Sequence, residues 1–381
     1  MSIKSVLFSP FRWIKRHFFK LTFFIVACIA AYLVYLDAQI QPRFEGNKWQ
    51  VPAQIYARPL TIELKQEITI KEVVDELNLL GYRKQAEANE VGEHSRSSDQ
   101  LTIFRREFYY PSNLYPKQRI QIKWNSGRVT KINILDSVNT LSRTSLEPWL
   151  VSRLVGGLDE DRMLMSDVDI PHLLKAGLVA VEDKNFYDHH GVAPLSIIRA
   201  FIANVSAGRT VQGGSTLTQQ LVKNLFLTRQ QSYSRKLKEA AMALVIDARY
   251  SKDEILNAYI NEVFLGQNGA VAVHGFGLGS HYFFNKPLKE LEIEEIATLI
   301  GLVKGPSFYD PKRHVERMTK RRDLVLRMLF EASEINREEF ETALNKPLVT
   351  NNNPSLASGK HPAFMDKVRS ELKQVVQTPE S

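Results

Sequence analysis

Cysteine is almost absent from this chain, which carries a single thiol, Cys28, among 381 residues. Cys28 lies in an apolar stretch near the N-terminus, so neither a disulfide framework nor a cysteine metal site can form. No internal repeat is visible. A P-loop is also lacking, because Gly214 and Ser215 follow Gly213 where nucleotide binding needs Lys and then Ser or Thr. Disulfide-stapled and nucleotide-hydrolysing classes are therefore disfavoured.

What is present is typical of a folded protein with a mildly basic surface. Hydrophobic residues make up 44% of the chain and charged residues 24%. The net charge of +8 suggests a partner that carries phosphate or anionic lipid, although a basic surface can also serve solubility alone. The length fits a membrane anchor and about two domains.

A long apolar run near the N-terminus predicts a transmembrane helix over residues 18–36, interrupted only by Lys20 and Thr22. At about 1.5 Å per residue, such a helix just spans a bilayer core. Basic residues precede or begin the run: Lys4, Arg12, Lys15, Arg16 and Lys20. The positive-inside rule therefore makes residues 1–17 a cytoplasmic tail and places the remainder outside. A cleaved signal peptide is the alternative, but no small-x-small cleavage site follows closely.

The rest of the chain divides into a small mixed domain and a larger helical one. Residues 37–57, with two prolines and a glycine, are expected to form an extended connector. Residues 58–148 predict a small α+β domain without an obvious chemical constellation. Its expected elements are a helix over 68–81, a loop over 85–100, strands over 101–110, 119–124 and 128–135, and a hairpin turn at 125–127.

Residues 149–345 change to helical patterns. Pro171 opens one helix, and Ser251 with Glu254 forms a capping box before another. Because no strands alternate with these helices, the domain is expected to be mainly α. Residues 346–381 are predicted to be a polar linker.

The first of three polar clusters is VEDKNFYDHHG, residues 181–191. Glu182 and Asp183 follow an apolar run beside aromatic residues, which can leave a carboxylate partly dry, raise its pKa and make it a usable base. The alternative is a helix end with solvated acids. The adjacent His189 and His190 lack the i, i+4 spacing with which a helix holds zinc.

The second cluster, residues 208–227, places glycines before a helix that Ser215 or Thr216 can cap. Such a helix start favours anions. Thr216, Gln220 and Lys223 fall on one polar face of the helix. An ordinary solvated face is the alternative.

The third cluster begins at Arg235, which forms an i, i+4 pair with Glu239 beside Lys236. An exposed pair of this kind is usually worth only about 0.3–0.5 kcal/mol. The functional alternative is a carboxylate oriented by an arginine beside a phosphate-binding lysine.

In this order and spacing, the clusters resemble the motifs of the peptidoglycan glycosyltransferases, found in class A penicillin-binding proteins and monofunctional transglycosylases. The matching segments are Glu182-Asp183-x-x-Phe186-x-x-His189-x-Gly191, Gly213-Gly214-Ser215-Thr216-Leu217-Thr218-Gln219-Gln220, Arg235-Lys236-x-x-Glu239, Asn261-Glu262-Val263-Phe264-Leu265-Gly266 and Lys304-Gly305-Pro306-Ser307-x-Tyr309-x-Pro311. The resemblance extends through the anchor and the small domain to the 1b type of Gram-negative bacteria.

This resemblance implies a lysozyme-like α fold and polymerisation of lipid II, with inversion and release of undecaprenyl diphosphate. It makes Glu182 the general base and Glu239 a second catalytic residue, which assists either by holding the donor diphosphate through a divalent cation such as Mg²⁺ or by orienting the acceptor. The residues it places around the substrate are Asp183, Phe186, His189, Gly213, Thr216, Gln220, Lys223, Arg235 and Lys236. Of these, Lys223, Arg235 and Lys236 would balance the diphosphate charge.

The resemblance also implies partners and a location. These are a bacterial inner membrane crossed once, a periplasmic catalytic domain, the lipid-linked glycan chain and an outer-membrane lipoprotein activator at residues 58–148. A homodimer and contacts with divisome or elongasome proteins are further expectations; a nucleic-acid partner is not. The apolar residues 192–207 suggest a flap that dips into the membrane. Relatives continue into a transpeptidase, but here Ser370-x-x-Lys373 lies near the chain end, so no penicillin-binding activity is expected.

Two other functions compete with this interpretation. A lysozyme-like lytic glycosidase also uses two glutamates, but hydrolysis of glycan needs no cluster of cations for a diphosphate. A non-catalytic scaffold that recruits cell-wall partners through residues 58–148 would have no use for intact polar clusters.

Overall fold

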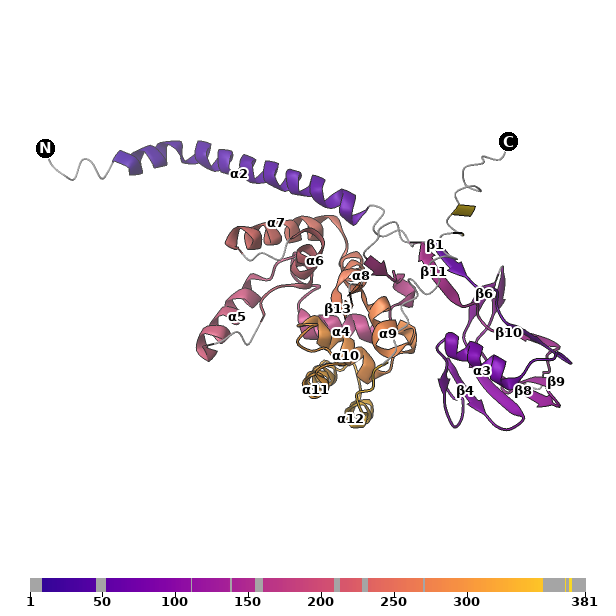
Figure 1. Ribbon diagram of the computed structural model, residues 1–381. Coiled ribbons are helices and arrows are strands. Elements are labelled where there is room, and N and C mark those ends of the chain that lie inside the picture. The colour runs from indigo at the N-terminus through magenta and orange to yellow at the C-terminus, as the bar shows by residue number, and fades with distance from the viewer. Residues whose placement is uncertain are drawn as a thin grey trace, which may run out of the picture.

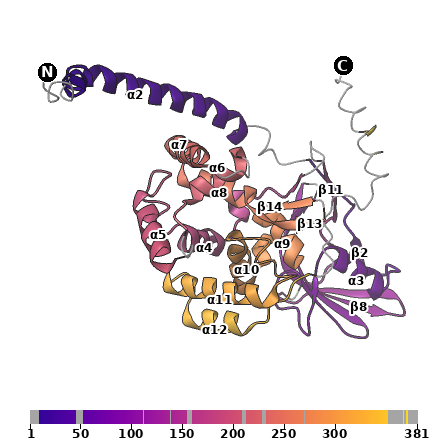
Figure 2. The ribbon, with the colours of Figure 1, turned by 60° about the vertical axis from the view of Figure 1, so that its left-hand side comes forward.

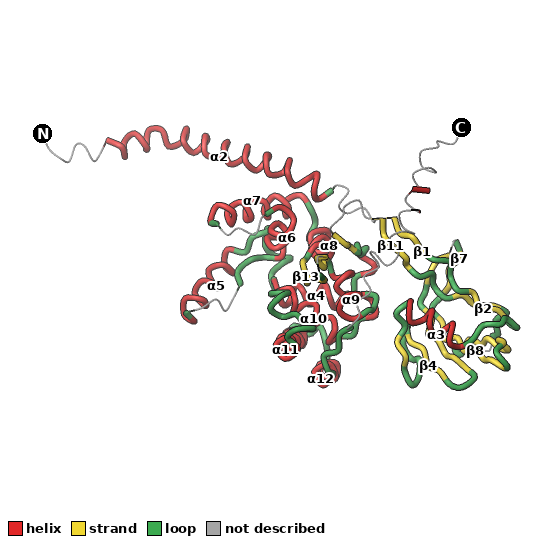
Figure 3. Tube along the Cα trace, viewed as in Figure 1, coloured by secondary structure: helices red, strands yellow, loops and turns green. Residues whose placement is uncertain are grey.

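The computed structural model describes residues 9–45, 53–110, 112–137, 139–154, 160–208, 213–227, 232–269 and 271–351, together with residues 367, 370 and 371. Figure 1 shows a long N-terminal helix, a helical unit beneath its C-terminal end and a small unit rich in strands. The strands gather in the small unit, as Figure 3 shows. Most of the linker predicted for 346–381, including Lys373, falls outside the described residues.

The N-terminal helix α2 (Ser9–Phe44) is longer than the sequence indicates. Its residues 18–44 are apolar and long enough to cross a membrane. Residues 37–44 were expected in an extended connector, and that expectation is wrong. Leu36, Ile40 and Phe44 recur at four-residue spacing and are buried against the helical unit, so tertiary packing extends the helix through Pro42.

Ionic and aromatic contacts fasten the C-terminal end of α2 to the helical unit. Asp37 accepts hydrogen bonds from Arg249 at 2.7 and 2.9 Å. Phe44 stacks on Tyr250 with 4.0 Å between ring centroids. The N-terminal helix therefore continues without a break onto the helical unit.

The small unit is an α+β domain, as predicted. Its five-stranded sheet has the order β3-β4-β5-β8-β9, with β3 at Arg83–Lys84, β4 at Glu93–Arg96, β5 at Gln100–Arg105, β8 at Gln118–Asn125 and β9 at Arg128–Ile134. Helix α3 (Ile70–Leu79) begins at a capping box formed by Thr69 and Glu72. It packs Val73 and Leu77 into the core, beside Leu101, Ile122 and Ile132.

Two details of the small domain differ from the sequence patterns. The stretch 85–100 was expected to be a loop, yet it contains β4, a short polar strand that only its pairing with β5 reveals. The run 101–110 breaks into β5 and β6 (Phe108–Tyr110), which pairs with β7 (Asn113–Tyr115). The predicted hairpin turn is confirmed, because Ser126 and Gly127 both have positive φ, as a type I′ turn requires.

Two strand pairs lie where the chain enters and leaves the small domain. β1 (Ala53–Tyr56) pairs with β11 (Leu150–Leu154), and β2 (Thr61–Glu63) pairs with β10 (Arg143–Ser145). The chain therefore enters and leaves this domain side by side. β1 lies in the stretch expected to be a connector.

The helical unit is mainly α, as predicted. Its helices are α4 (His172–Glu182), α5 (Pro194–Ala207), α6 (Leu217–Phe226), α7 (Tyr233–Arg249), α8 (Lys252–Glu262), α9 (Phe276–Phe284), α10 (Ile293–Val303), α11 (Val315–Glu331) and α12 (Arg337–Asn345). A small sheet of order β12-β14-β13 was not expected; its strands are β12 (Glu160–Arg162), β13 (Phe264–Asn268) and β14 (Val271–His274). Short strands of this length leave little alternation in the sequence.

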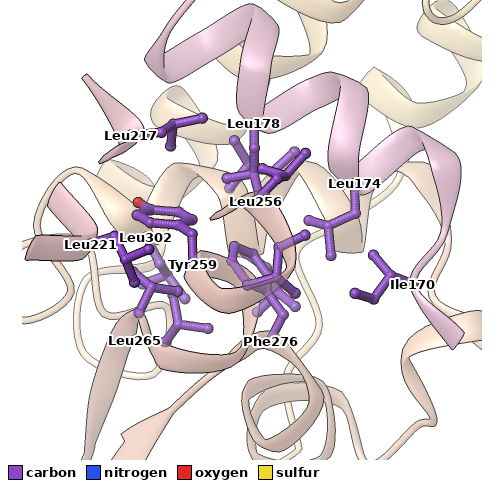
Figure 4. Close-up of a cluster of buried hydrophobic side chains, with 14 of the residues drawn as sticks. Ile170, Leu174, Leu178, Leu217, Leu221, Leu256, Tyr259, Leu265, Phe276 and Leu302 are labelled. Atoms are coloured by element: carbon purple, nitrogen blue, oxygen red, sulfur yellow. The ribbon is translucent and has the colours of Figure 1, made fainter. Parts of the chain in front are cut away.

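The core of the helical unit surrounds α8. Figure 4 shows Tyr259 of α8 with Leu256, Leu221 and Leu302, which come from three helices. Helix α10 packs against both α4 and α11, and Figure 2 shows α11 and α12 below α4 and α10. This packing holds the C-terminal end of α4 beside α6, α8 and α11.

A buried ionic contact joins the small domain to the helical unit. Arg106 donates to both carboxylate oxygens of Glu290, which ends the 3₁₀ turn η3 (Leu288–Glu290), and the Nη2–Oε2 distance is 2.9 Å. Arg106 also donates to Glu147 at 3.0 Å. The two domains are thus docked through a guanidinium that is paired on both sides.

Candidate active site

Glu182 is the last residue of α4, and its carboxylate is largely enclosed. Leu174 and Leu178 bury the preceding turns of α4 in the core, which fixes where the helix ends. The Gln220 amide Nε2 donates to Glu182 Oε2 at 3.2 Å. On the other side, the guanidinium of Arg321 lies 3.6 Å from Glu182 Oε1.

Burial raises the pKa of Glu182 above its usual value of 4.5, and this is the largest influence on the group. The hydrogen bond from Gln220 and the charges of Arg321, Lys304 and Lys223 oppose that rise. The result is a carboxylate that is more basic than an ordinary glutamate and still surrounded by positive charge. A general base for an alcohol needs this property.

Asp183, the next residue, ties α4 to the start of α6. Its Oδ2 accepts hydrogen bonds from His189 Nε2 and from the backbone N–H of Leu217, each at 2.9 Å. A carboxylate is stabilising at a helix N-terminus, where free N–H groups point outward. The side chains of Asp183 and His189 are only 6% and 8% exposed, so this pair fixes the distance between the two helices.

Thr216 caps α6 and contacts the loop that joins α4 to α5, residues 183–193. Its hydroxyl accepts from Gln219 N–H in a capping box and donates to the carbonyl of Gly191 at 2.6 Å. Gly191 has φ of +75°, and a Cβ there would lie 2.3 Å from the carbonyl oxygen of Ala243. Only glycine fits this position, since both conformation and space exclude a side chain.

Phe186 forms the buried floor of the loop. Its ring is fully enclosed, and Lys252 Nζ lies 4.9 Å from the ring centroid while donating to the carbonyl of His189 at 2.6 Å. Asp183, Phe186 and His189 were predicted to surround the substrate, and that prediction stays untested. Their burial gives them a supporting part in holding Glu182 in place.

The polar face of α6 is divided between the protein interior and the surface. Gln220 is half-buried and bonded to Glu182, while Lys223 is exposed. Before the helix, Gly213 is also exposed, and a Cβ there would meet nothing within 4 Å. Lys223 and Gly213 are therefore accessible to a ligand.

The start of α7 brings together the residues of the third cluster. Glu239 is only 2% exposed, and Lys236 donates to its Oε1 while Arg235 lies 3.6 Å from its Oε2. Lys236 also donates to the hydroxyl of Ser215 at 2.8 Å, which links α7 to the N-terminus of α6. The pair that sequence spacing gave as usually exposed is thus a buried carboxylate between two cations.

Comparison with known proteins agrees with this arrangement. Residues 150–330 match the family described as Transglycosylase. This stretch is a transglycosylase domain. Residues 62–146 match the family described as Bifunctional transglycosylase second domain. The helical unit is accordingly a transglycosylase domain with the expected lysozyme-like fold.

Relatives match along most of the chain. Penicillin-binding protein 1B of Vibrio cholerae is 43% identical over 355 residues, which cover 93% of this chain and 46% of the relative. Penicillin-binding protein 1B of Escherichia coli is 40% identical over 353 residues, covering 93% of this chain and 42% of the relative. The chain therefore spans about half the length, or slightly less, of the relatives it matches.

The transglycosylase domain does not offer an evident resident metal site at Glu239. Both of its oxygens face cations, and no group of three or more His, Cys, Asp and Glu side chains suited to a metal occurs among the described residues. Binding of a cation here would place it beside Lys236 and Arg235, against their charge. Among the described residues, the side chains around Glu239 thus form no ready-made donor set, and the divalent cation that the resemblance implies stays a prediction.

Sequence reasoning missed two side chains at the site. Arg321 of α11 lies on the buried stripe with Met318 and Val325, and a charge on an apolar stripe was the available signal. Tyr259 recurs at helical spacing with Ile255 and Val263, a pattern that indicates a packed helix face, yet its hydroxyl donates to Gln220 Oε1 at 3.0 Å. Both side chains reach Glu182 or its partner from helices distant in sequence.

Proposed function

We propose that this chain is a membrane-anchored peptidoglycan glycosyltransferase that polymerises lipid II into glycan strands. The reaction inverts the anomeric centre and releases undecaprenyl diphosphate. The observation that carries the proposal is Glu182, an enclosed carboxylate of raised pKa among cations, in a transglycosylase domain.

Glu182 acts as the general base in this proposal. It takes the proton from the sugar 4-hydroxyl of the acceptor as that oxygen attacks C1 of the lipid-linked chain. A raised pKa increases the driving force for this transfer, while Arg321 and Gln220 keep part of the population ionised and ready. The supporting geometry is the enclosed carboxylate with a donor or cation near each oxygen.

The leaving diphosphate needs positive charge, which the starts of α6 and α7 supply. Lys223 and Lys236 are exposed, so both ammonium groups can reach an anion. The buried Nε–H of Arg235 has no hydrogen-bond partner among the described residues, and a phosphate oxygen would satisfy it. Glu239 holds Lys236 and Arg235 in place between turnovers. The divalent cation stays a prediction, and no step here depends on it.

Membrane attachment follows from α2 and from an apolar surface on α5. Leu195, Ile198, Ile202 and Val205 are exposed along α5, more apolar surface than a solvated helix usually presents. We place α5 in the outer leaflet of a bacterial inner membrane, where it admits the lipid tail of the substrate. The N-terminus is then cytoplasmic and the transglycosylase domain periplasmic.

The small domain, residues 58–148 of the sequence prediction, serves as the docking site for an outer-membrane lipoprotein activator in this proposal. Its fixed contact with the transglycosylase domain, through Arg106 and Glu290, supports a transmitted effect. A homodimer and contacts with divisome or elongasome proteins remain expectations of the same kind.

Incubation of the detergent-solubilised chain with lipid II tests the proposal. Growth of glycan strands, blocked by moenomycin as a mimic of the lipid-linked donor, is the expected result. Shortening of purified glycan without strand growth would instead establish a lytic glycosidase. Unchanged lipid II turnover in Glu182→Gln would contradict the assigned base.

A further inference from the structure

Tyr259 of α8 lies at the end of a short hydrogen-bond chain that reaches the base. Its side chain is fully buried, and its hydroxyl donates to Gln220 Oε1 at 3.0 Å. The Nε2 of the same amide then donates to Glu182 Oε2 at 3.2 Å. Figure 4 shows the ring of Tyr259 within the leucine core and its oxygen at the edge of that cluster. Three helices, α8, α6 and α4, are thus joined through one amide.

The amide of Gln220 has two possible orientations, and only one of them helps an ionised base. With Nε2 toward Glu182, the amide donates to the carboxylate. With Oε1 toward Glu182, two acceptors would face each other in a buried site, which is unfavourable. A hydroxyl at the far end of the amide favours the first orientation when its proton has no acceptor other than Oε1, because the reverse orientation would leave that proton without a hydrogen bond.

Tyr259 meets this requirement because it keeps its proton. Burial, and then the negative charge of Glu182, raise the pKa of the Tyr259 phenol well above its usual value of 10.0. Across the range in which a glutamate titrates, the hydroxyl therefore keeps a proton that it can donate. No other hydrogen-bond partner of the Tyr259 hydroxyl occurs within the described part of the chain, so its proton is directed to Gln220.

The other groups that face Glu182 act by charge alone. They are Arg321 from α11, 3.6 Å from Oε1, Lys304 at the C-terminal end of α10, and Lys223 from α6. Their attraction does not depend on the orientation of the amide. The contribution of Tyr259 is directional and acts on the other oxygen, Oε2.

We propose that Tyr259 is a positioning residue for the reaction: it fixes the Gln220 amide so that this amide donates to Glu182 and keeps the carboxylate ionised. This inference rests on the proposed function of Glu182 as the base. Both amide atoms make a hydrogen bond inside the protein, so Gln220 orients the base. The contact of Gln220 with the substrate, expected from the resemblance, stays a prediction.

The test is the pH dependence of lipid II polymerisation by the full chain carrying Tyr259→Phe, which keeps the ring and removes only the donor. The acid limb of the pH profile of kcat, where the rate falls as Glu182 takes up a proton, should move to higher pH by about one unit. A hydrogen bond to a charged group shifts a pKa by about this amount. KM for lipid II should change little, because the hydroxyl does not touch the substrate. A merely structural role would lower the melting temperature and leave the limb in place.

Tyr282→Phe is the matched control. Tyr282 is also buried and donates its hydroxyl to a carbonyl, that of Gln267 at 3.3 Å, which lies in the small β13 strand. The acid limb of the kcat profile of Tyr282→Phe should coincide with that of the parent chain. A shift as large as that of Tyr259→Phe would overturn the inference, because any lost tyrosine hydroxyl would then produce it.

A second variant, Gln220→Met, removes the amide while keeping a side chain of similar length. It should move the acid limb in the same direction, and adding Tyr259→Phe to it should move the limb no further, since Tyr259 acts through Gln220. If Tyr259→Phe alone does not fold, the shift in Gln220→Met carries the test. A folded Tyr259→Phe with an unmoved limb, or additive shifts in the double variant, would refute the inference.

The two proposals fail in different ways. If Glu182→Gln retains full turnover, the base is misassigned and this inference falls with it. If Glu182→Gln abolishes turnover while Tyr259→Phe leaves the acid limb unmoved, the proposed function stands and only the role of Tyr259 is lost.

Discussion

Two glutamates of the candidate active site have the same side chain and opposite surroundings. Glu239, at the start of α7, is buried with a cation at each oxygen. Glu182, at the end of α4, is also enclosed, but the Gln220 amide donates to one oxygen and the Arg321 guanidinium lies 3.6 Å from the other. Burial raises the pKa of Glu182. A buried carboxylate with a cation at each oxygen thus stays ionised and holds those cations in place, whereas a buried carboxylate with weaker ionic contacts becomes a stronger base.

The sharpest test of this contrast is Glu182→Gln. Without the carboxylate no group accepts the acceptor proton, so turnover of lipid II should fall by about 10²–10⁴, the range of general base catalysis. Radiolabelled or fluorescent lipid II measures the rate. Glu331→Gln is the control, because Glu331 ends α11 as Glu182 ends α4, but is exposed. A loss of similar size in Glu331→Gln would show that a helix end, not the base, had been disturbed.

Glu239→Gln should act mainly on stability and on binding of the donor. Arg235 and Lys236 lose their common partner, and an unsatisfied charged group costs about 1–3 kcal/mol, at the lower end here because Lys236 is half exposed. Chemical denaturation in detergent measures the loss, and KM for the lipid-linked chain should rise. Equal stability with a large fall in kcat alone would place Glu239 in the chemistry instead.

Arg321→Gln should sharpen the difference between the two glutamates. Removing the cation beside Oε1 raises the pKa of Glu182 further, so the acid limb of kcat should move to higher pH, by about one unit. Arg317→Gln, one turn earlier on α11 and stacked on Phe308 at the surface, is the control. A limb that moves to lower pH in Arg321→Gln would show that the guanidinium does not stabilise the ionised base.

The sequence predicted the parts of this fold that depend on local rules. The capping box at Ser251 and Glu254 begins α8 as expected, and the turn at Ser126 and Gly127 joins β8 to β9. Predictions from local sequence patterns were wrong where packing against distant parts of the chain determines how far a helix extends. Helix α2 continues to Phe44 because the transglycosylase domain buries one of its faces, which nothing within residues 37–44 specifies.

The same division applies to the site. The order of the acidic, Thr-Gln and Arg-Lys-Glu clusters was enough to single out Glu182 and Glu239. It could not show which of them is fully paired, because the partners of Glu182 come from α6 and α11, which are distant from it in sequence. Tyr259 was missed for the same reason: its spacing indicated packing, and its hydroxyl contact crosses from α8 to α6.

The smallest expected effect concerns stability and pH. The native state of the parent chain binds the Glu182 proton more tightly than the unfolded state, because its pKa lies above 4.5. Between those two pKa values the stability of the parent chain must fall as pH rises. Glu182→Gln lacks this titration. The free energy of unfolding of the variant minus that of the parent should therefore increase with pH through the raised pKa and stay flat below about pH 4. A difference that does not vary with pH would mean that Glu182 is as ordinary a carboxylate as its exposed neighbours.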